Sequence, residues 1–555
     1  MNYEIVGMIM ALLGGLGLFL FGMKLMGDGL ELAAGAKLRG MIEKLTKNKY
    51  MGALVGLIVT ALIQSSSATT VMVVGFVNAG LMDLAQAVGV IMGANIGTTI
   101  TAFIIAINLT AIAPIATFAG VVMMCFINKN SVKHIGQIIA GFGILFMGMN
   151  IMSTAMEPLA QMPEFTGLLT TFSNPLWGVM AGMLFTALIQ SSSASVGVLQ
   201  ALGSVGAITL PSAVYIIYGQ NIGTCITALI ACVGTSKTAK RTAIVHLLFN
   251  VIGTILFVII AMTLPFAQII ENIVPNNIMM QISLVHTTFN VVCTAIMLPL
   301  SNYLIKIACK IVTGEDPKKE TKQLAFLDER VLQTPPMAVS LLFKEAERMG
   351  NIAKNNFSIA MDALINSDEE KIKEVYENEE VIDYLNGGIT EFLIKVNELE
   401  IPDSDTRRLT GLYRAIGDME RIGDHSENIC ELSQILIKHK AKFGDAALKD
   451  TKELSSKVGE ILEKSMNMLI NGSSGHNLEM EISQMEENID ILTEECKERH
   501  IERINKGECS AVSSTVYMDL LTNLERIADH ANNIAFCMVD KQHISEIKKT
   551  ATATM

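Results

Sequence analysis

Hydrophobic and polar positions divide this chain of 555 residues into two parts of different character. From the N-terminus to about Ile305, long apolar runs predominate, and several approach the ~20 residues that a helix needs to cross a bilayer. From about Glu315 onward, charged residues alternate with apolar ones at helical spacing. The pattern predicts an all-α protein: a polytopic membrane domain over residues 1–310, a linker over 311–335 and a soluble helical domain over 336–545.

The membrane part contains a duplication. The segment TALIQSSSA occurs at Thr60–Ala68 and again at Thr186–Ala194, at an offset of 126 residues. At that offset, 25 of 55 positions are identical without a gap between residues 52–106 and 178–232, including a second shared segment, NIGT. Such internal similarity predicts two homologous units within one domain.

Lysine and arginine residues indicate how the two copies are oriented. The stretch AKLRGMIEKLTKNKY before the first copy is rich in them, whereas EPLAQMPEFTGLLTTFSNP before the second has none. Because these residues stay on the cytoplasmic side, we expect inverted repeats separated by three crossings. The N-terminus is then outside the plasma (inner) membrane and the soluble domain is cytoplasmic; the first apolar run is expected to be a retained helix rather than a signal peptide. Inverted repeats are typical of secondary transporters, which hold their substrate near the midplane.

The polar centre of each repeated segment is the candidate binding site. The apolar arms that flank each QSSS are too short to span, which predicts re-entrant hairpins with the polar residues at their tips. Backbone N–H groups and hydroxyls there can bind an anion, and carbonyl and hydroxyl oxygens can bind a hard cation. NIGT is expected at a glycine-broken helix. The candidate substrate- and cation-binding residues are Gln64, Ser65, Ser66, Ser67, Asn95, Thr98, Gln190, Ser191, Ser192, Ser193, Asn221 and Thr224.

Two alternatives concern these polar residues. Serine, threonine and glycine also mediate helix packing in membranes, an interpretation that we favour less for two identical copies than for one. His246 and Asn250, like His286 and Asn290, are spaced i, i+4. For these four, buried polar packing between helices is the favoured interpretation over a proton or ion relay.

The paired QSSS segments make the membrane domain similar to the type II sodium–phosphate cotransporters. That resemblance implies transport of phosphate with Na⁺ and places substrate and sodium at Gln64–Ser67 and Gln190–Ser193. Animal electrogenic members have an aspartate shortly after the first motif, where this chain has FVNAGLMD, ending in Asp83. The charge moved per cycle therefore stays open.

The soluble part is also duplicated. MERIGDHSENI from Met419 matches LERIADHANNI, and EEVIDYL matches EENIDIL about as far downstream, which predicts two tandem three-helix bundles. Carboxylates at i, i+4 share a helix face: they bind a metal or, as is commoner, pair with neighbouring bases. The repeated E-R-[IL]-x-D-H pattern resembles PhoU phosphate-signalling regulators, which implies a divalent or iron-type metal at Glu420, Asp424, Glu525 and Asp529.

Overall composition excludes several classes of function. The net charge of −12 argues against a nucleic-acid partner, and the nine cysteines lack any CxxC spacing. No nucleophile–base pair or P-loop is visible, so we expect no enzyme activity. We therefore predict a sodium-coupled importer of inorganic phosphate, in contact with membrane lipid, whose PhoU-like domain regulates transport through a partner protein or self-association. The alternatives are a membrane phosphate sensor and a cotransporter of another small anion.

Overall fold

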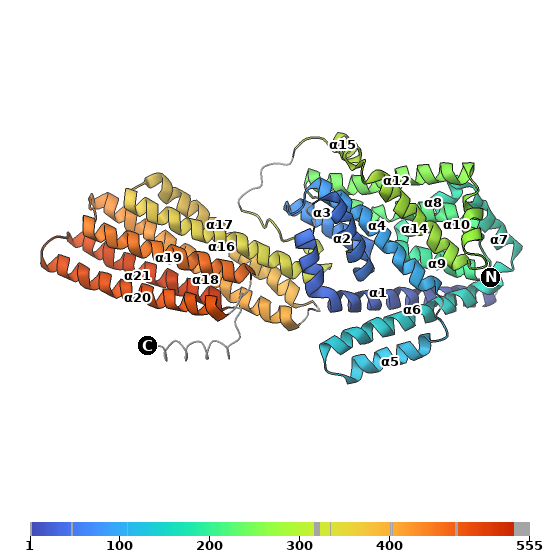
Figure 1. Ribbon diagram of the computed structural model, residues 1–555, viewed down its shortest axis with the longest axis horizontal. Helices are drawn as coiled ribbons and strands as arrows, with labels where there is room; N and C mark the ends of the chain where they lie inside the picture. The colour runs from blue at the N-terminus through green and yellow to red at the C-terminus, as the bar shows by residue number, and fades with distance from the viewer. Residues whose placement is uncertain are drawn as a thin grey trace. The chain divides into compact units, whose positions relative to one another are not determined.

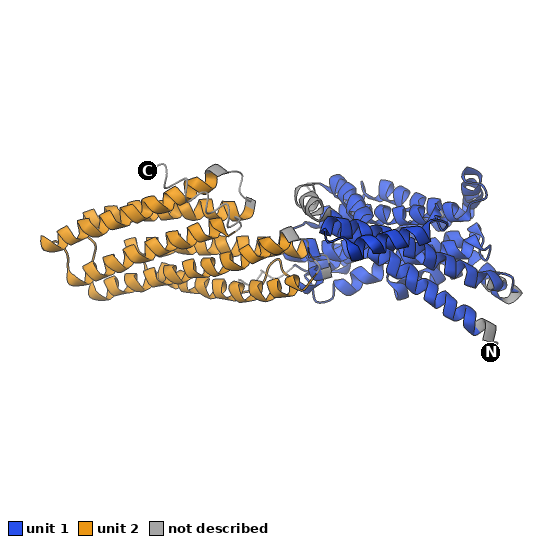
Figure 2. Cartoon of the chain, turned by 90° about the horizontal axis from the view of Figure 1, so that it is seen from below, with its two compact units in different colours: residues 1–317, 328–336 blue, residues 318–327, 337–555 orange. Residues whose placement is uncertain are grey.

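Helices account for all regular secondary structure in the described chain, as the sequence predicts (Figure 1). The computed structural model describes residues 3–45, 48–107, 109–315, 322–333, 335–399, 401, 403–471 and 476–537. Contacts divide the chain into two compact units (Figure 2). Unit 1 comprises residues 1–317 and 328–336, and unit 2 comprises residues 318–327 and 337–555.

Unit 1 contains seventeen helical elements among its described residues, fifteen α-helices and two short 3₁₀ helices. They are α1 (Tyr3–Leu45), α2 (Lys49–Ile63), α3 (Ser66–Ala79), α4 (Leu84–Ala106), α5 (Ala113–Phe126), α6 (Asn130–Ala160), α7 (Pro163–Thr170), η1 (Thr171–Ser173), α8 (Pro175–Ile189), α9 (Ser192–Ser204), α10 (Leu210–Gly223), α11 (Cys225–Ala231), α12 (Lys237–Thr263), α13 (Phe266–Ile273), α14 (Ile278–Met297) and α15 (Ser301–Ile311), before the short η2 (Glu329–Gln333).

Six helical segments of the described residues are long and apolar enough to cross a membrane, as expected of a multi-pass membrane domain. They are Val6–Ala33, Leu84–Ala106, Asn130–Pro158, Leu210–Ala231, Lys237–Thr263 and Ile278–Met297. Helices α2, α3, α5 and α8 are apolar but shorter. With 14 residues, α5 is only ~21 Å long, so the three crossings expected between the copies are not all of spanning length.

The two copies build the same local structure. Helices α2, α3 and α4 begin at residues 49, 66 and 84, and α8, α9 and α10 begin 126 residues later in each case. The expected break at NIGT is wrong for the first copy, because α4 runs through it unbroken. In the second copy, α10 ends at Gly223 and α11 begins at Cys225, but the intervening Thr224 has helical dihedral angles.

Glycines hold the paired helices of each copy together. A Cβ atom on Gly93 of α4 would lie well under 3.0 Å from the carbonyl oxygen of Ala53 on α2. Gly219 faces the carbonyl of Val179 in the same way, 126 residues later. These glycines permit backbone contact between helices, which explains their presence inside long helices where glycine is otherwise unfavourable.

Unit 2 consists of six long helices, of which the first three are here called the first bundle and the last three the second bundle. They are α16 (Pro335–Asn366), α17 (Glu369–Asn397), α18 (Asp403–His439), α19 (Asp445–Asn471), α20 (His476–Asn505) and α21 (Ala511–Phe536). The repeated E-R-[IL]-x-D-H segments lie on α18 and α21, which pack against each other: the rings of His425 and His530 stack with centroids 5.6 Å apart.

Candidate functional site

The two repeated glutamines end helices α2 and α8 in an unusual backbone conformation. Gln64 has φ 59° and ψ 21°, and Gln190 has φ 60° and ψ 21°. Left-handed angles are uncommon for a residue other than glycine and cluster at functional sites. The chain turns sharply at each glutamine, so residues 64–67 and 190–193 form two short polar turns, here called the first and second turn.

The first serine of each turn begins the next helix. The Oγ atoms of Ser65 and Ser191 accept hydrogen bonds from the N–H groups of Ala68 and Ala194, at 3.1 and 3.2 Å, as N-caps of α3 and α9. The second serines, Ser66 and Ser192, are the first helical residues and are each 5% exposed. Ser66 and Ser192, which the sequence predicts as ligands, therefore do not cap the helices. The capping residues are Ser65 and Ser191.

Each turn brings together opposite ends of two helices. The C-terminal carbonyls of α2 and the N-terminal N–H groups of α3 meet at the first turn, and those of α8 and α9 meet at the second. Hydroxyl pairs fasten each hairpin: Thr60 donates to Thr69 at 3.0 Å, and Thr186 donates to Ser195 at 2.8 Å. Partial negative and partial positive charge therefore lie side by side, an arrangement that can bind a cation and an anion together.

The two turns contact each other. The Oγ atom of Ser67 donates a hydrogen bond to the backbone carbonyl of Gln190 at 3.2 Å, across 123 residues of sequence. Polar groups from both copies therefore converge at one place in unit 1. No lysine or arginine among the described residues of this unit is buried, so the helix ends and polar side chains provide its internal electrostatics.

The turns differ in their environment although their sequences are identical. Gln64 is 7% exposed, and its Oε1 accepts a hydrogen bond from Thr101 Oγ1 at 2.8 Å. Gln190 is exposed. The counterpart of Thr101, Thr227, donates to the carbonyl of Thr224 at 3.0 Å. The two turns thus differ at the glutamine, which is buried in the first turn and exposed in the second.

The NIGT residues belong to a buried polar network on the neighbouring helices. The Oδ1 atom of Asn95 lies 3.3 Å from His246 Nε2, and that of Asn221 lies 3.2 Å from His286 Nε2. Thr98 and Thr224 bond to carbonyls of their own helices, at 3.0 and 2.9 Å. These hydrogen bonds agree with buried polar packing for both histidines.

That network extends to Asn290, whose Nδ2 lies 3.3 Å from Asn221 Oδ1. Asn250 instead donates to the Sγ atom of Cys225 at 3.2 Å. The two halves of the network therefore differ, as the two turns do.

Carboxylates gather between α17 and α18 in the first bundle of unit 2. Glu379 is 6% exposed, and neither of its oxygens has a hydrogen-bond partner in the described residues. Burial, followed by the nearby carboxylates of Asp383, Asp424 and Glu427, raises the pKa of Glu379 to about 8. Burial and Asp424 likewise raise the pKa of Glu420. A cation between the two helices would relieve this repulsion.

The second bundle has a related face between α20 and α21. Oxygen atoms of Glu486, Asp490 and Asp529 all lie within 4.8 Å of one another, close enough to share one metal ion. Glu525 is not one of these three, but it lies close enough to add to the effect of burial in raising the pKa of Asp490 and of Asp529, and its carboxylate pairs with Lys497 at 3.4 Å. All four metal ligands implied by the resemblance thus lie in acidic clusters.

Sequence reasoning missed the carboxylates on the preceding helices. Glu379 with Asp383, and Glu486 with Asp490, have the same i, i+4 spacing and lie in the repeated segments EEVIDYL and EENIDIL. That second repeat was the available signal. Pairing each segment with its partner helix required the tertiary structure.

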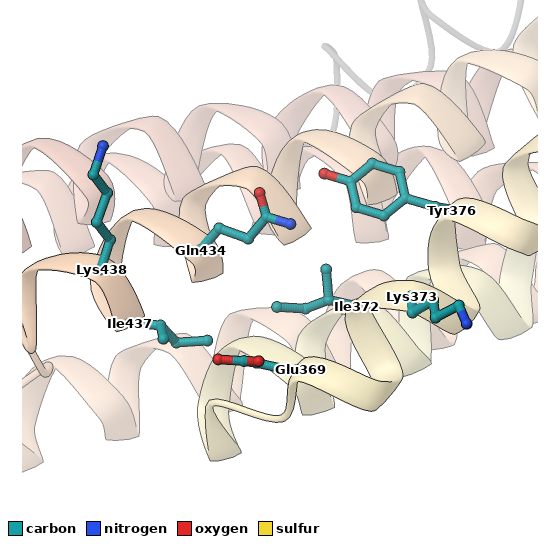
Figure 3. A pocket seen from close by; sticks show the side chains of 7 residues that line it. All are labelled: Glu369, Ile372, Lys373, Tyr376, Gln434, Ile437 and Lys438. Atoms are coloured by element: carbon teal, nitrogen blue, oxygen red, sulfur yellow. The ribbon is translucent and has the colours of Figure 1, made fainter.

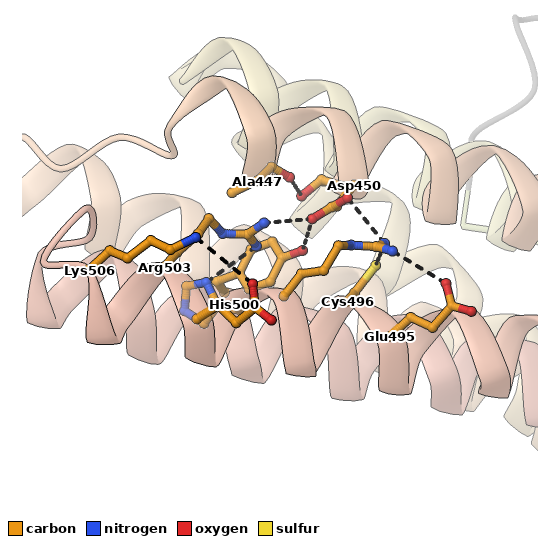
Figure 4. A network of polar contacts seen from close by, with 11 residues as sticks. Ala447, Asp450, Glu495, Cys496, His500, Arg503 and Lys506 are labelled. Carbon is orange, nitrogen blue, oxygen red and sulfur yellow. Dashed lines mark hydrogen bonds and ion pairs between the residues drawn. The ribbon is translucent and has the colours of Figure 1, made fainter.

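Unit 2 has two further polar features. A groove of about 440 Å³ between α17 and α18 is lined by both charges and apolar groups (Figure 3): Glu369, Ile372, Lys373, Tyr376, Gln434, Ile437 and Lys438. In the second bundle, Asp450 accepts from Arg499 at 3.2 Å and Arg503 at 2.8 Å (Figure 4). This partly buried network joins α19 to α20, and the ion pair with Asp450 compensates the largely buried charge of Arg503.

Comparison with known proteins agrees with the division into two halves. Residues 18–154 and 148–290 match the Na⁺/Pi-cotransporter family, and residues 346–433 and 451–538 match the PhoU domain, which confirms both resemblances. The Escherichia coli (strain K12) protein named "Putative inorganic phosphate export protein YjbB" is 23% identical over 538 residues, 96% of each chain.

Two more relatives match only part of the chain. The uncharacterized protein YqeW of Bacillus subtilis (strain 168) is 32% identical over 294 residues, 52% of this chain and 93% of YqeW. The sodium-dependent phosphate transport protein 2A of Rattus norvegicus is 39% identical over 99 residues, 17% of this chain and 15% of that protein.

Proposed function

Because the chain belongs to the Na⁺/Pi-cotransporter family and has PhoU domains in its C-terminal half, we propose that it is a sodium-coupled secondary transporter of inorganic phosphate. The observation that carries this proposal is the contact between the first and second turns, from Ser67 to Gln190. Both families point to a protein that is not an enzyme.

Coupling follows from the charges at the turns. Phosphate would be bound by the N-terminal N–H groups of α3 and α9 and by the hydroxyls of Ser66 and Ser192, and Na⁺ by carbonyl oxygens at the ends of α2 and α8. Without a buried basic side chain, an anion there depends on a co-bound cation for neutralisation. Binding of one ion then raises the affinity for the other.

The proposal also includes the direction of phosphate transport and the membrane topology of the chain. An inward Na⁺ gradient drives phosphate inward, so import is expected, although the name of YjbB refers to export. The lysine and arginine distribution supports inverted, re-entrant hairpins with unit 2 in the cytoplasm. The acidic faces of unit 2 support a regulatory domain that binds divalent or iron-type metal.

The uptake of radiolabelled phosphate into proteoliposomes tests this proposal. An inward Na⁺ gradient should drive accumulation, and Ser66→Ala or Ser192→Ala should lower the initial rate about 10- to 100-fold, the effect of losing a hydrogen bond worth ~1.5–3 kcal/mol to a charged ligand. Ser173→Ala, on the exposed η1, is the matched control. Sodium-independent phosphate flux, or normal uptake by both turn variants, would contradict the proposal; sodium-driven efflux would contradict import alone.

Stability of unit 2 should depend on pH and metal. In metal-free protein the pKa of Glu379 rises from 4.5 to about 8, so its contribution to the free energy of unfolding is complete below pH 4.5 and is lost as the pH rises through 8. The unfolding temperature of unit 2 in EDTA should therefore be lower at pH 8.5 than at pH 5.5, and Mn²⁺ should restore it. Glu379→Gln should remove much of the difference. A wild-type protein insensitive to both pH and Mn²⁺ would refute the cation site.

A further inference from the structure

Helix α1 passes directly beside the first turn. A Cβ atom on Gly27 would lie 3.1 Å from the carbonyl oxygen of Ile63 and 3.8 Å from the Cβ atom of Gln64. Ile63 is the last residue of α2, and its carbonyl is one of the terminal groups that have no N–H partner within the helix. Gly27 thus lets α1 contact the negative end of the α2 dipole.

One helical turn further along α1 lies a buried carboxylate, Glu31. It follows Gly27 at i+4 and so shares the face of α1 that meets the first turn. Glu31 is 9% exposed, and its Oε1 atom has no hydrogen-bond partner in the described residues. It lies within the candidate membrane span Val6–Ala33. An acidic side chain buried in a span is costly and is a sign of function.

No other described carboxylate of unit 1 is buried to this degree. Asp83, close after the first turn in sequence, is an N-cap: its Oδ1 accepts the N–H of Gln86 at 2.7 Å, and the Gln86 side chain bonds back to complete a capping box. Asp28, on the same helix as Glu31, is exposed. Glu31 is therefore the buried acidic side chain available inside the described part of unit 1.

We propose that Glu31 is a ligand of the coupling Na⁺ beside the first turn. A carboxylate oxygen and the C-terminal carbonyls of α2 are hard oxygen donors, and the helix dipole adds negative potential at the same point. An anion would be repelled there. The inference deepens the proposed function, on which it rests: one Na⁺ is held by α1 and α2, outside the pair of turns that would hold phosphate.

This placement has a consequence for the transport cycle. When Glu31 is ionised, the empty site contains an uncompensated charge in a low-dielectric environment, and Na⁺ binding neutralises it. Movement of the site across the membrane is then favourable only when it is loaded. Glu31→Gln, which keeps the size of the side chain without its charge, should permit movement without that Na⁺.

Equilibrium binding of ²²Na⁺ to the purified full-length protein in detergent tests this assignment. We expect Glu31→Gln to weaken Na⁺ binding by at least tenfold, Glu31→Asp to have an intermediate affinity, and Glu157→Gln, an exposed carboxylate on α6, to match the wild type. In proteoliposomes, Glu31→Gln should lower the number of Na⁺ ions moved per phosphate by one. Unchanged Na⁺ affinity in Glu31→Gln would overturn the inference.

A second measurement on the wild-type protein does not depend on how the variants fold. Dicyclohexylcarbodiimide labels carboxyl groups in apolar surroundings, and mass spectrometry can quantify its adduct on Glu31. We expect Na⁺ but not choline to slow this labelling; equal rates would overturn the assignment. If Na⁺ slows the labelling but no phosphate uptake occurs, the Glu31 site is supported and the transport proposal is refuted. If Na⁺ drives uptake but does not slow the labelling, the transport proposal is supported and the Glu31 site is refuted.

Discussion

Replacement of Gln64 by glycine should abolish most phosphate uptake while the protein stays folded. Glycine adopts the left-handed conformation of this position without strain, so the relief offsets the ~0.5–1 kcal/mol that a glycine costs through the unfolded chain. What disappears is the amide, together with its hydrogen bond from Thr101. We expect the initial rate to fall about 100-fold, or ~2.7 kcal/mol of transport barrier. Gln190→Gly should have a similar effect at the second turn.

A matched control exists elsewhere in unit 1. Asn276 is also a non-glycine residue with positive φ, at 58°, and it is exposed in the loop before α14. Asn276→Gly should change neither uptake nor unfolding temperature appreciably. If Gln64→Gly transports phosphate at the same rate as this control, the Gln64 side chain is not needed for transport. That result would contradict its proposed role in binding.

Gly93→Val should prevent unit 1 from folding. A side chain at this position meets the carbonyl of Ala53, and because that obstacle is backbone, α2 and α4 must separate to accommodate it. We expect a loss of at least ~4 kcal/mol, comparable to severe core overpacking, and therefore little monodisperse protein on size-exclusion chromatography. Gly219→Val should act likewise in the second copy.

The control is the same substitution where space is open. Gly17, on α1, has no atom within 4 Å of an added Cβ atom. Gly17→Val should give a normal yield, since valine is well accommodated in apolar surroundings. A folded, thermally unchanged Gly93→Val protein would show that helix contact through glycine is not what holds α2 to α4.

Much of this architecture was predictable from the chain because the sequence is duplicated. The offset of 126 residues predicts matching helices in the two copies, and α8, α9 and α10 begin at the residues that this offset predicts. The break expected at NIGT fails in α4 for a physical reason: Gly97 faces the carbonyl of Leu57 and the side chain of Thr60, so it serves close packing and not a change of direction.

Other features depend on contacts that no local pattern contains. Glu379 and Glu486 become site candidates only when α17 lies against α18 and α20 lies against α21. Glu31 is one of four acidic residues in α1, and only the tertiary structure shows that it is buried and that Gly27, one turn away, approaches the end of α2. The pairing of Glu525 with Lys497 depends equally on tertiary structure.

The hydrogen bond from Ser67 to Gln190 means that the convergent site belongs to neither copy alone. An ancestral chain with a single copy would have half of it and would need a second chain to complete it. Fusion of two copies fixes their ratio at one to one and frees each half to mutate separately. Gln64 is buried and Gln190 is exposed although their segments are identical in sequence, because the residues around them differ.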